Sequence, residues 1–248
     1  MTIPFNFSFW AEYQPPIITT GLYAYFDGSN PSSLPTSATT GSIWTSISGT
    51  STGTTAVINS VIEGPAVSYT GDYQGGLNLN AYGHQGVSVN KLLLPSSGTT
   101  DWTYETWINT AVGGTGFDTL YSIGSGSILF RIINQPNTEK ILVQPYPSTG
   151  AGEIGSGVTN GQNIHIVITY NYTTKQTKCY VNNVLQPQVL SPVWTYNITQ
   201  SSSSIGIATG LAGRWQGIMY KIRTYAGILT AGQVENNWNA EKQQYGYY

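Results

Sequence analysis

Residues 163–185 carry the clearest local pattern in the chain. Large apolar residues occupy every second position of the first part, which is the period of a β-strand with one buried face: Ile164, Ile166, Ile168 and Tyr170. Residues 171–174 predict a turn, and residues 176–181 predict the returning strand. Asn182-Asn183 then predicts a tight hairpin turn, because asparagine tolerates positive φ better than other non-glycine residues. The segment therefore predicts antiparallel β-structure packed on a core.

A second informative strand is predicted at residues 102–109, where large side chains fall on both faces. Trp102, Tyr104 and Ile108 share one parity of this strand, whereas Trp107 has the other. A strand of this kind must be covered on both sides, as happens in the middle of a layered sheet.

Other segments predict short strands separated by turns. These strands cover residues 22–26, 77–79, 86–89, 120–123, 128–133 and 216–225. In the last of them Ile218, Tyr220 and Ile222 share a parity, which predicts a common face. Residues 36–55 are nearly all Ser, Thr and Gly, and they predict a long loop pinned by Trp44.

The only helical pattern covers residues 230–241. Thr230 is suited to the N-cap, and Val234 and Trp238 form an apolar pair four residues apart. The chain is rich in Gly, Ser, Thr and Asn, but 18 Tyr, 7 Trp and 6 Phe supply the aromatic residues that disordered chains lack. A length of 248 residues suits one all-β sandwich or barrel.

The charge balance excludes several classes of partner. Nine Lys and Arg against eleven Asp and Glu provide no basic stripe for phosphates, so we expect no nucleic-acid binding. No apolar run is long enough for a membrane helix, and residues 1–16 lack the regions of a Sec-type signal peptide, so we expect neither membrane insertion nor Sec export. Cys179 is the only cysteine, which excludes a disulfide framework and a cysteine metal site.

Residues 1–20 differ from the rest of the chain, and we divide it into an N-terminal arm, 1–20, and one domain, 21–248. The arm alternates aromatic residues at strand period and ends in Pro15-Pro16, which we expect to hold it away from the domain. It is either an edge strand of its own domain or an arm that docks on a neighbouring subunit. We expect the second, with these residues in contact with a partner: Phe5, Phe7, Phe9 and Trp10.

The order of these elements resembles the laminin G-like branch of the concanavalin A-like lectin/glucanase jelly rolls. Residues 25–33 and 44–49 are similar to its opening strand and its W-T-D-L-S-G loop. Further similar segments follow in order at 75–79, 86–89, 102–109, 163–185 and 216–234. The resemblance spans roughly residues 21–245 and implies an all-β jelly-roll β-sandwich with one short C-terminal helix. Such domains are common in phage and giant-virus structural proteins and in bacterial surface proteins.

Glycosidases of this superfamily use closely spaced carboxylates on one strand, and that pattern, E-x-D-x-x-E, is absent here. Each glutamate is isolated from other acids along the chain. Glu105 is the only candidate for a buried acid, and we expect it to be an unpaired structural residue. For His165 we expect a place in the core or an interface. The chain is therefore expected not to be an enzyme, and no catalytic residue is assigned.

Ligand-binding candidates combine an aromatic ring with polar groups on turns, as sugar binding requires. They are Tyr82, His84, Tyr146, Arg214 and Trp215, and His84 is expected on a turn. Such residues are more often loop anchors than ligand contacts, and both interpretations stay open. A Ca2+ site stays open too: residues 80–85 lack an acid, and Asp72 and Asp118 are scattered, so no ligand is named and no other cofactor is expected.

Two functions fit these features. The first is a non-catalytic structural or decoration protein of a virus or phage particle, located in the virion and oligomeric, held through its arm by other virion or assembly subunits, with capacity to bind a host or surface glycan. The alternative is a carbohydrate-binding lectin or adhesin module of a bacterial surface or secreted protein, located outside the cell or on its surface.

Overall fold

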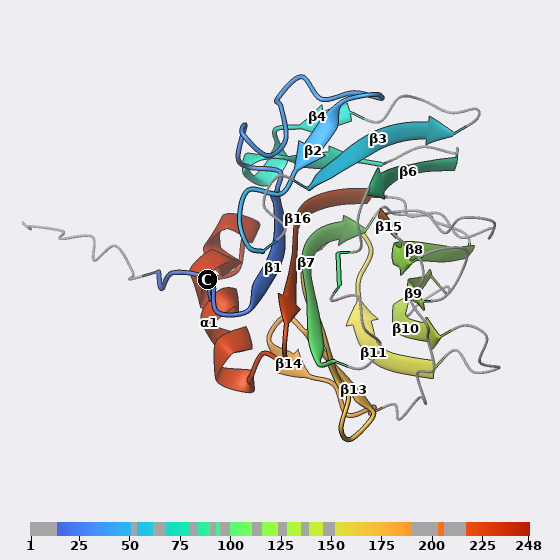
Figure 1. Ribbon diagram of the computed structural model, residues 1–248, viewed down its shortest axis with the longest axis vertical. Helices are drawn as coiled ribbons and strands as arrows, with labels where there is room; N and C mark the ends of the chain where they lie inside the picture. The colour runs from blue at the N-terminus through green and yellow to red at the C-terminus, as the bar shows by residue number, and fades with distance from the viewer. Residues whose placement is uncertain are drawn as a thin grey trace, which may run out of the picture.

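Two antiparallel β-sheets packed face to face make up the fold (Figure 1). The computed structural model describes residues 14–50, 54–61, 68–79, 84–89, 93–94, 100–110, 116–123, 128–134, 139–145, 152–189, 203–205 and 217–248. A helix, α1 (Ala231–Glu241), lies on the outer side of one sheet. These residues therefore confirm the all-β sandwich with a short C-terminal helix.

The first sheet, sheet A, has the predicted strand 102–109 near its middle. Its strands in spatial order are β14 (Val184–Leu185), β13 (Gln176–Val181), β12 (Asn163–Asn171), β7 (Trp102–Thr110), β16 (Gly217–Ala226), β5 (Gly76–Asn78) and β4 (Ser68–Thr70). A further strand, β1 (Leu22–Asp27), pairs with the second half of β16, on the same edge that β5 uses.

The second sheet, sheet B, packs against the inner face of sheet A. Its strands in spatial order are β11 (Gly152–Val158), β10 (Glu139–Pro145), β9 (Ile128–Asn134), β8 (Gly116–Ile123), β15 (Ser203–Ile205), β6 (His84–Val89), β3 (Thr55–Val61) and β2 (Ile43–Thr45). Chain neighbours such as β7 and β8 lie in opposite sheets, so several connections cross from one layer to the other.

The core between the sheets is apolar and aromatic. The predicted apolar face of β12 lies there, together with Trp44, which packs edge to face on Phe26 at 5.7 Å between ring centroids. Tyr104 of sheet A stacks on Tyr121 of sheet B at 5.5 Å. Burial of these rings is the main source of stability for a sandwich of this size.

Both faces of β7 are covered, as its sequence predicts. Trp102, Tyr104 and Ile108 face the core between the sheets, whereas Trp107 faces α1 and is fully buried.

Thr230 begins the helix with a capping box: its hydroxyl accepts from the Gln233 N–H, and the Gln233 side chain accepts from the Thr230 N–H.

The predicted hairpin turn is confirmed. Asn182 and Asn183 both have positive φ, 49° and 65°, and they join β13 to β14. Two consecutive left-handed residues match the right-handed twist of the flanking strands, which is why a two-residue loop suffices here.

Three local predictions are wrong. Residues 36–55 do not form one long loop, because Ile43–Thr45 pairs with β3, although Trp44 is buried as expected. His84 does not lie on a turn, since it begins β6 and is paired with Val61. In each case the strand is recognised by its pairing with β3, which no local pattern predicts.

The third error concerns β16, where a register shift between Met219 and Lys221 breaks the alternation. Tyr220 therefore contacts Trp107 on the helix side, whereas Met219 and Ile222 lie in the core between the sheets. A β-bulge of this kind changes which residues share a face, so Ile222 does not lie on the Tyr220 face.

Residues 14–18, which we call the strap, lie against α1 (Figure 1). The Pro16 carbonyl accepts from Asn236 Nδ2 at 2.7 Å, and Ile17 and Ile18 pack on the side chains beneath the helix. Pro15-Pro16 thus does not hold this part of the predicted arm away from the domain. The boundary between residues 20 and 21 stays a prediction.

Among the described residues, no helix has the length and apolar character that crossing a membrane requires.

Trp107→Ala should lower the free energy of unfolding by about 3–5 kcal/mol, because it removes a fully buried ring from between Tyr245 and Trp238. Urea denaturation followed by far-UV circular dichroism measures this change. The control is Val184→Ala, where the side chain is 62% exposed and the expected change is below about 0.5 kcal/mol. Equal effects of the two substitutions would contradict this description of the outer layer.

Candidate functional site

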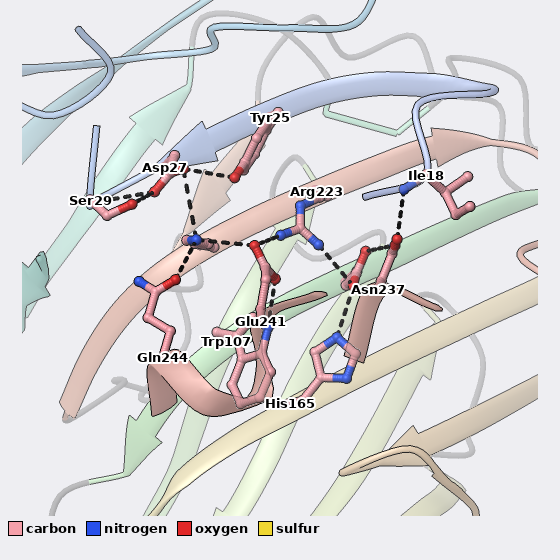
Figure 2. Close-up of polar contacts among 12 residues, drawn as sticks. Ile18, Tyr25, Asp27, Ser29, Trp107, His165, Arg223, Asn237, Glu241 and Gln244 are labelled. Carbon is pink, nitrogen blue, oxygen red and sulfur yellow. Dashed lines mark hydrogen bonds and ion pairs between the residues drawn. The ribbon is translucent and has the colours of Figure 1, made fainter. Parts of the chain in front are cut away.

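The buried Asp, Glu, His, Lys and Arg side chains of the described residues gather in one place. They lie on the outer face of sheet A, beneath α1 (Figure 2). We call this set the buried charge cluster: Asp27, Glu105, His165, Lys221, Arg223 and Glu241. Because β1, β7, β12, β16 and α1 each contribute to it, the cluster forms only when both chain ends have folded onto the sheet.

Arg223 is the centre of the cluster. Its Nη1 lies 3.0 Å from Glu105 Oε1, and its Nη2 donates to Glu241 Oε1, so it bridges β7 and α1. Desolvation opposes the buried cation, but the carboxylates of Glu241 and Glu105 raise the pKa of Arg223 well above its ordinary value. A guanidinium suits this position, since its fixed fork of N–H groups reaches two carboxylates at once.

Glu105 is ionised and fully engaged. It accepts from His165 Nε2 at 2.8 Å, and its other oxygen accepts from the Tyr225 hydroxyl and Asn237 Nδ2, both at 3.0 Å. Desolvation alone would raise the pKa of Glu105, but Arg223 and the hydrogen bond from His165 lower it to about 2. A carboxylate only accepts hydrogen bonds, so His165 Nε2 carries the hydrogen. His165 Nδ1 has no partner among the described residues.

Glu241 fastens the end of α1 to the sheet. Its carboxylate accepts from Lys221 Nζ at 3.0 Å and from Trp107 Nε1 at 2.9 Å, besides Arg223. Lys221 also donates to Gln244 at 3.0 Å and lies 3.9 Å from Asp27 Oδ2. The cluster therefore continues to the end of β1.

The contacts of this cluster join α1 to sheet A. Glu105 is 1% exposed, and its low pKa keeps it from donating a proton as the acid of a glycosidase must. One expectation from the sequence is corrected here: Glu105 is not unpaired, because it pairs with Arg223, which Glu241 shares although it is distant along the chain. The expected core position of His165 is confirmed.

Most candidates for ligand or partner contact lie outside the described residues: Phe5, Phe7, Phe9, Trp10, Tyr82, Tyr146, Arg214 and Trp215. The described strands nevertheless fix where the loops leave the sandwich. The end of β5, the start of β6, the end of β15 and the start of β16 lie at one end, which we call the His84 end. The segments with Tyr82 and with Arg214-Trp215 both leave from it.

Tyr146 follows the end of β10, and that strand end lies at the opposite end of the sandwich. The register runs from Pro145 through Ile128 and Ile123 to Ser203, and from there to Val89 at the far end of β6. The register thus places the start of β6 and the end of β15 at one end of sheet B and the end of β10 at the other.

The described residues give no support for a metal centre. No three His, Cys, Asp or Glu side chains converge within that part of the chain. Asp72 is exposed and accepts from the Thr70 hydroxyl at 2.8 Å, and Asp118 lies within β8. The prediction on calcium is untested for the segments outside the description.

The sequence analysis missed the cations and the amide of the cluster. Lys221 and Arg223 stand within an otherwise apolar strand in a chain with only 8% charged residues. A buried Lys or Arg needs a carboxylate partner, so this pair of cations was the available signal. The sequence carries no comparable signal for Asn237, because nothing in its neighbourhood on the helix marks it as buried.

Comparisons with known proteins agree with this fold. A laminin G-like family model, described as the concanavalin A-like lectin/glucanases superfamily, matches residues 80–235. Domain 4 of an extracellular arabinanase from Geobacillus stearothermophilus, solved in complex with arabinotriose, is similar over 90% of this chain and 100% of that one, with a TM-score of 0.63 and 17% identity. A search of curated proteins found no match.

Two further solved structures are similar over parts of longer chains. A Trypanosoma rangeli sialidase is matched over 95% of this chain and 37% of its own, with a TM-score of 0.62 and 14% identity. The receptor-binding domain of botulinum neurotoxin D is matched over 90% of this chain and 53% of its own, with a TM-score of 0.62 and 12% identity. This chain thus spans only about a third to a half of those proteins.

The stability of the protein should fall in acid through Glu105. Its pKa is lowered from 4.5 to about 2 on folding, so its contribution is complete above pH 5 and is lost as the pH falls from 4.5 towards 2. The shift corresponds to about 3 kcal/mol. Urea denaturation at pH values from 7 to 2.5 measures the loss, and Glu105→Gln should show a smaller one. Identical pH dependence in both proteins would contradict the ionised, paired state of Glu105.

Proposed function

Because the chain belongs to the concanavalin A-like lectin/glucanase superfamily, we propose that it is a non-catalytic carbohydrate-binding module. The observation that carries this proposal is the match to the whole of arabinanase domain 4, a separate domain solved with arabinotriose bound. The sialidase and neurotoxin matches extend the same fold to proteins of other activities, so the fold by itself assigns no site.

The His84 end of the sandwich is the proposed binding surface. The segments that carry Tyr82 and Arg214-Trp215 leave the described strands there, next to His84. We expect Tyr82, Arg214 and Trp215 of these segments to supply aromatic faces and hydrogen-bond donors, which together suit the apolar and polar faces of a sugar ring.

The proposal that the module is non-catalytic rests on its buried acids. Glu105 and Glu241 are neighbours in space, but both are committed to Arg223 beneath α1. Hydrolysis with retention needs two carboxylates about 5 Å apart on either side of a bound sugar, one of them protonated. Glu105 does not meet these needs, because it is sealed from solvent and its low pKa keeps it ionised.

We further propose that the arm attaches the module to a larger assembly, and that this assembly is a virus or phage particle. The supporting observation is the strap, whose residues 14–18 lie along α1, so the arm meets the domain on the outer side of sheet A. An attachment there leaves sheet B and the His84 end free for a glycan. The alternative location of such a module is a bacterial surface or a secreted protein.

Titration with arabinotriose and with a panel of surface glycans should show binding by isothermal calorimetry. Tyr82→Ala and Trp215→Ala should each weaken it about tenfold or more, equivalent to about 1.4 kcal/mol. Tyr146→Ala, at the opposite end of the sandwich, is the matched control and should leave the affinity unchanged. No reducing ends should appear in the same samples. Absence of binding to every glycan, or cleavage of one, would contradict the proposal.

The triple substitution Phe7→Ser, Phe9→Ser and Trp10→Ser should abolish assembly and leave the melting temperature within a few degrees. These aromatic residues present more apolar surface than a free terminus leaves in water, so we expect them to pack on a partner. Sedimentation velocity and co-fractionation with particles measure assembly. The interleaved pair Asn6→Ala and Ser8→Ala is the control and should assemble normally. A monomeric triple variant that melts much earlier would instead make the arm an edge strand of its own domain.

A further inference from the structure

The strap is attached to the helix layer rather than to the sheet. The Ile18 N–H donates to Asn237 Oδ1 at 2.7 Å, the Pro16 carbonyl accepts from Asn236 Nδ2 at 2.7 Å, and Gln14 Nε2 donates to Gln243 at 3.0 Å. Among the described residues, every hydrogen bond between the strap and the rest of the chain goes to α1 or to the turn that follows it. The position of the strap therefore depends on the position of the helix.

Asn237 connects the strap to the buried charge cluster. Its side-chain oxygen accepts from the Ile18 N–H (Figure 2). Its Nδ2 donates to Glu105 Oε2 at 3.0 Å and to the Tyr225 hydroxyl at 3.0 Å. The Asn237 amide thus binds both the strap and Glu105, because its oxygen faces the strap and its nitrogen faces the carboxylate. A displaced helix would lose both sets of contacts together.

The core between the sheets has no comparable charges. None of the buried charged side chains of the described residues belongs to its hydrophobic cluster, whereas the buried carboxylates all lie in the outer layer. That layer has smaller apolar clusters of its own, around Val234 and around Trp107. Acid therefore acts on the outer layer first, since protonation of carboxylates changes nothing in the main core.

Protonation would reverse the balance of charge beneath α1. The groups that face Glu105 and Glu241 are Tyr25 and Asp27 of β1, His165 of β12, Lys221, Arg223 and Tyr225 of β16, and Tyr245 after α1. At neutral pH three carboxylates compensate Lys221 and Arg223. Once the carboxylates are neutral, two buried cations lack counter-charges, which is costly in a dry site.

We propose that α1 and the strap form one acid-released clasp. Protonation of the carboxylates in the buried charge cluster detaches the helix and the strap together, while the sandwich of two sheets stays folded. Release uncovers the outer face of sheet A around Trp107 and Tyr220 and frees the residues of the strap from α1. Because Asn237 contacts both the strap and Glu105, a partner that pulls the strap from α1 also weakens the contact between Glu105 and the helix. This inference requires neither glycan binding nor a particle.

Hydrogen exchange measured by mass spectrometry on the full chain tests the clasp at pH values from 7 to 2.5, with exchange times scaled to the intrinsic rate. Peptides covering residues 14–20 and 231–245 should lose protection together in acid, by about tenfold or more, whereas residues 163–171 of β12 should keep theirs. Glu105→Gln, which mimics the neutral acid, should show the same loss already at pH 7.

Asn236→Ala is the matched control, because Asn236 contacts the strap but not the cluster. It should loosen residues 14–20 alone and leave residues 231–245 protected, whereas Asn237→Ala should loosen both. If Glu105→Gln fails to fold, the acid series on the native protein, together with the Asn236→Ala control, still tests the clasp. The clasp is overturned if the two segments lose protection at different pH values, if β12 loses protection with them, or if no segment changes.

Discussion

Arg223 is held between two carboxylates in a site that excludes water, and the outer layer of the molecule depends on this contact. Desolvating three charges is expensive, and well-packed apolar residues often replace buried ion pairs without loss of stability. The ion pairs instead fix the position of α1 on the sheet. An apolar helix face slides along a sheet at modest cost, but Glu241 satisfies Arg223, Lys221 and Trp107 at one placement of α1. The same placement brings Asn237 to Glu105.

The bulge in β16 is what gives the cluster its second cation. A regular strand would alternate, so Tyr220 and Lys221 would point to opposite faces. The register shift after Met219 turns both towards the helix, where Tyr220 packs on Tyr245 and Lys221 reaches Glu241. One extra residue therefore supplies an aromatic ring and a charge to the outer layer while Met219 and Ile222 keep their places in the core.

Sequence reasoning succeeded where the signal is local. The alternation in 163–170, the paired asparagines of the hairpin and the capping residue of α1 are each visible within a few positions, and all three are confirmed. It failed where a partner is distant. β2 is too short to show a period, the bulge in β16 leaves no mark on composition, and Glu105 meets Arg223 and Glu241 only through the order of the strands. The grouping of the Tyr82 and Trp215 segments at one end likewise needs the register of both sheets.

The use of charge inside the molecule bears on what its surface can recognise. Five of the 20 Asp, Glu, Lys and Arg residues lie in the buried charge cluster: Asp27, Glu105, Lys221, Arg223 and Glu241. A chain with only 8% charged residues is left with few charges outside for steering a partner over long range. Recognition must then rely on short-range contacts of hydroxyls, amides and aromatic rings. Those groups match neutral sugars better than they match a strongly charged ligand. The low content of charged residues is therefore consistent with the carbohydrate-binding proposal.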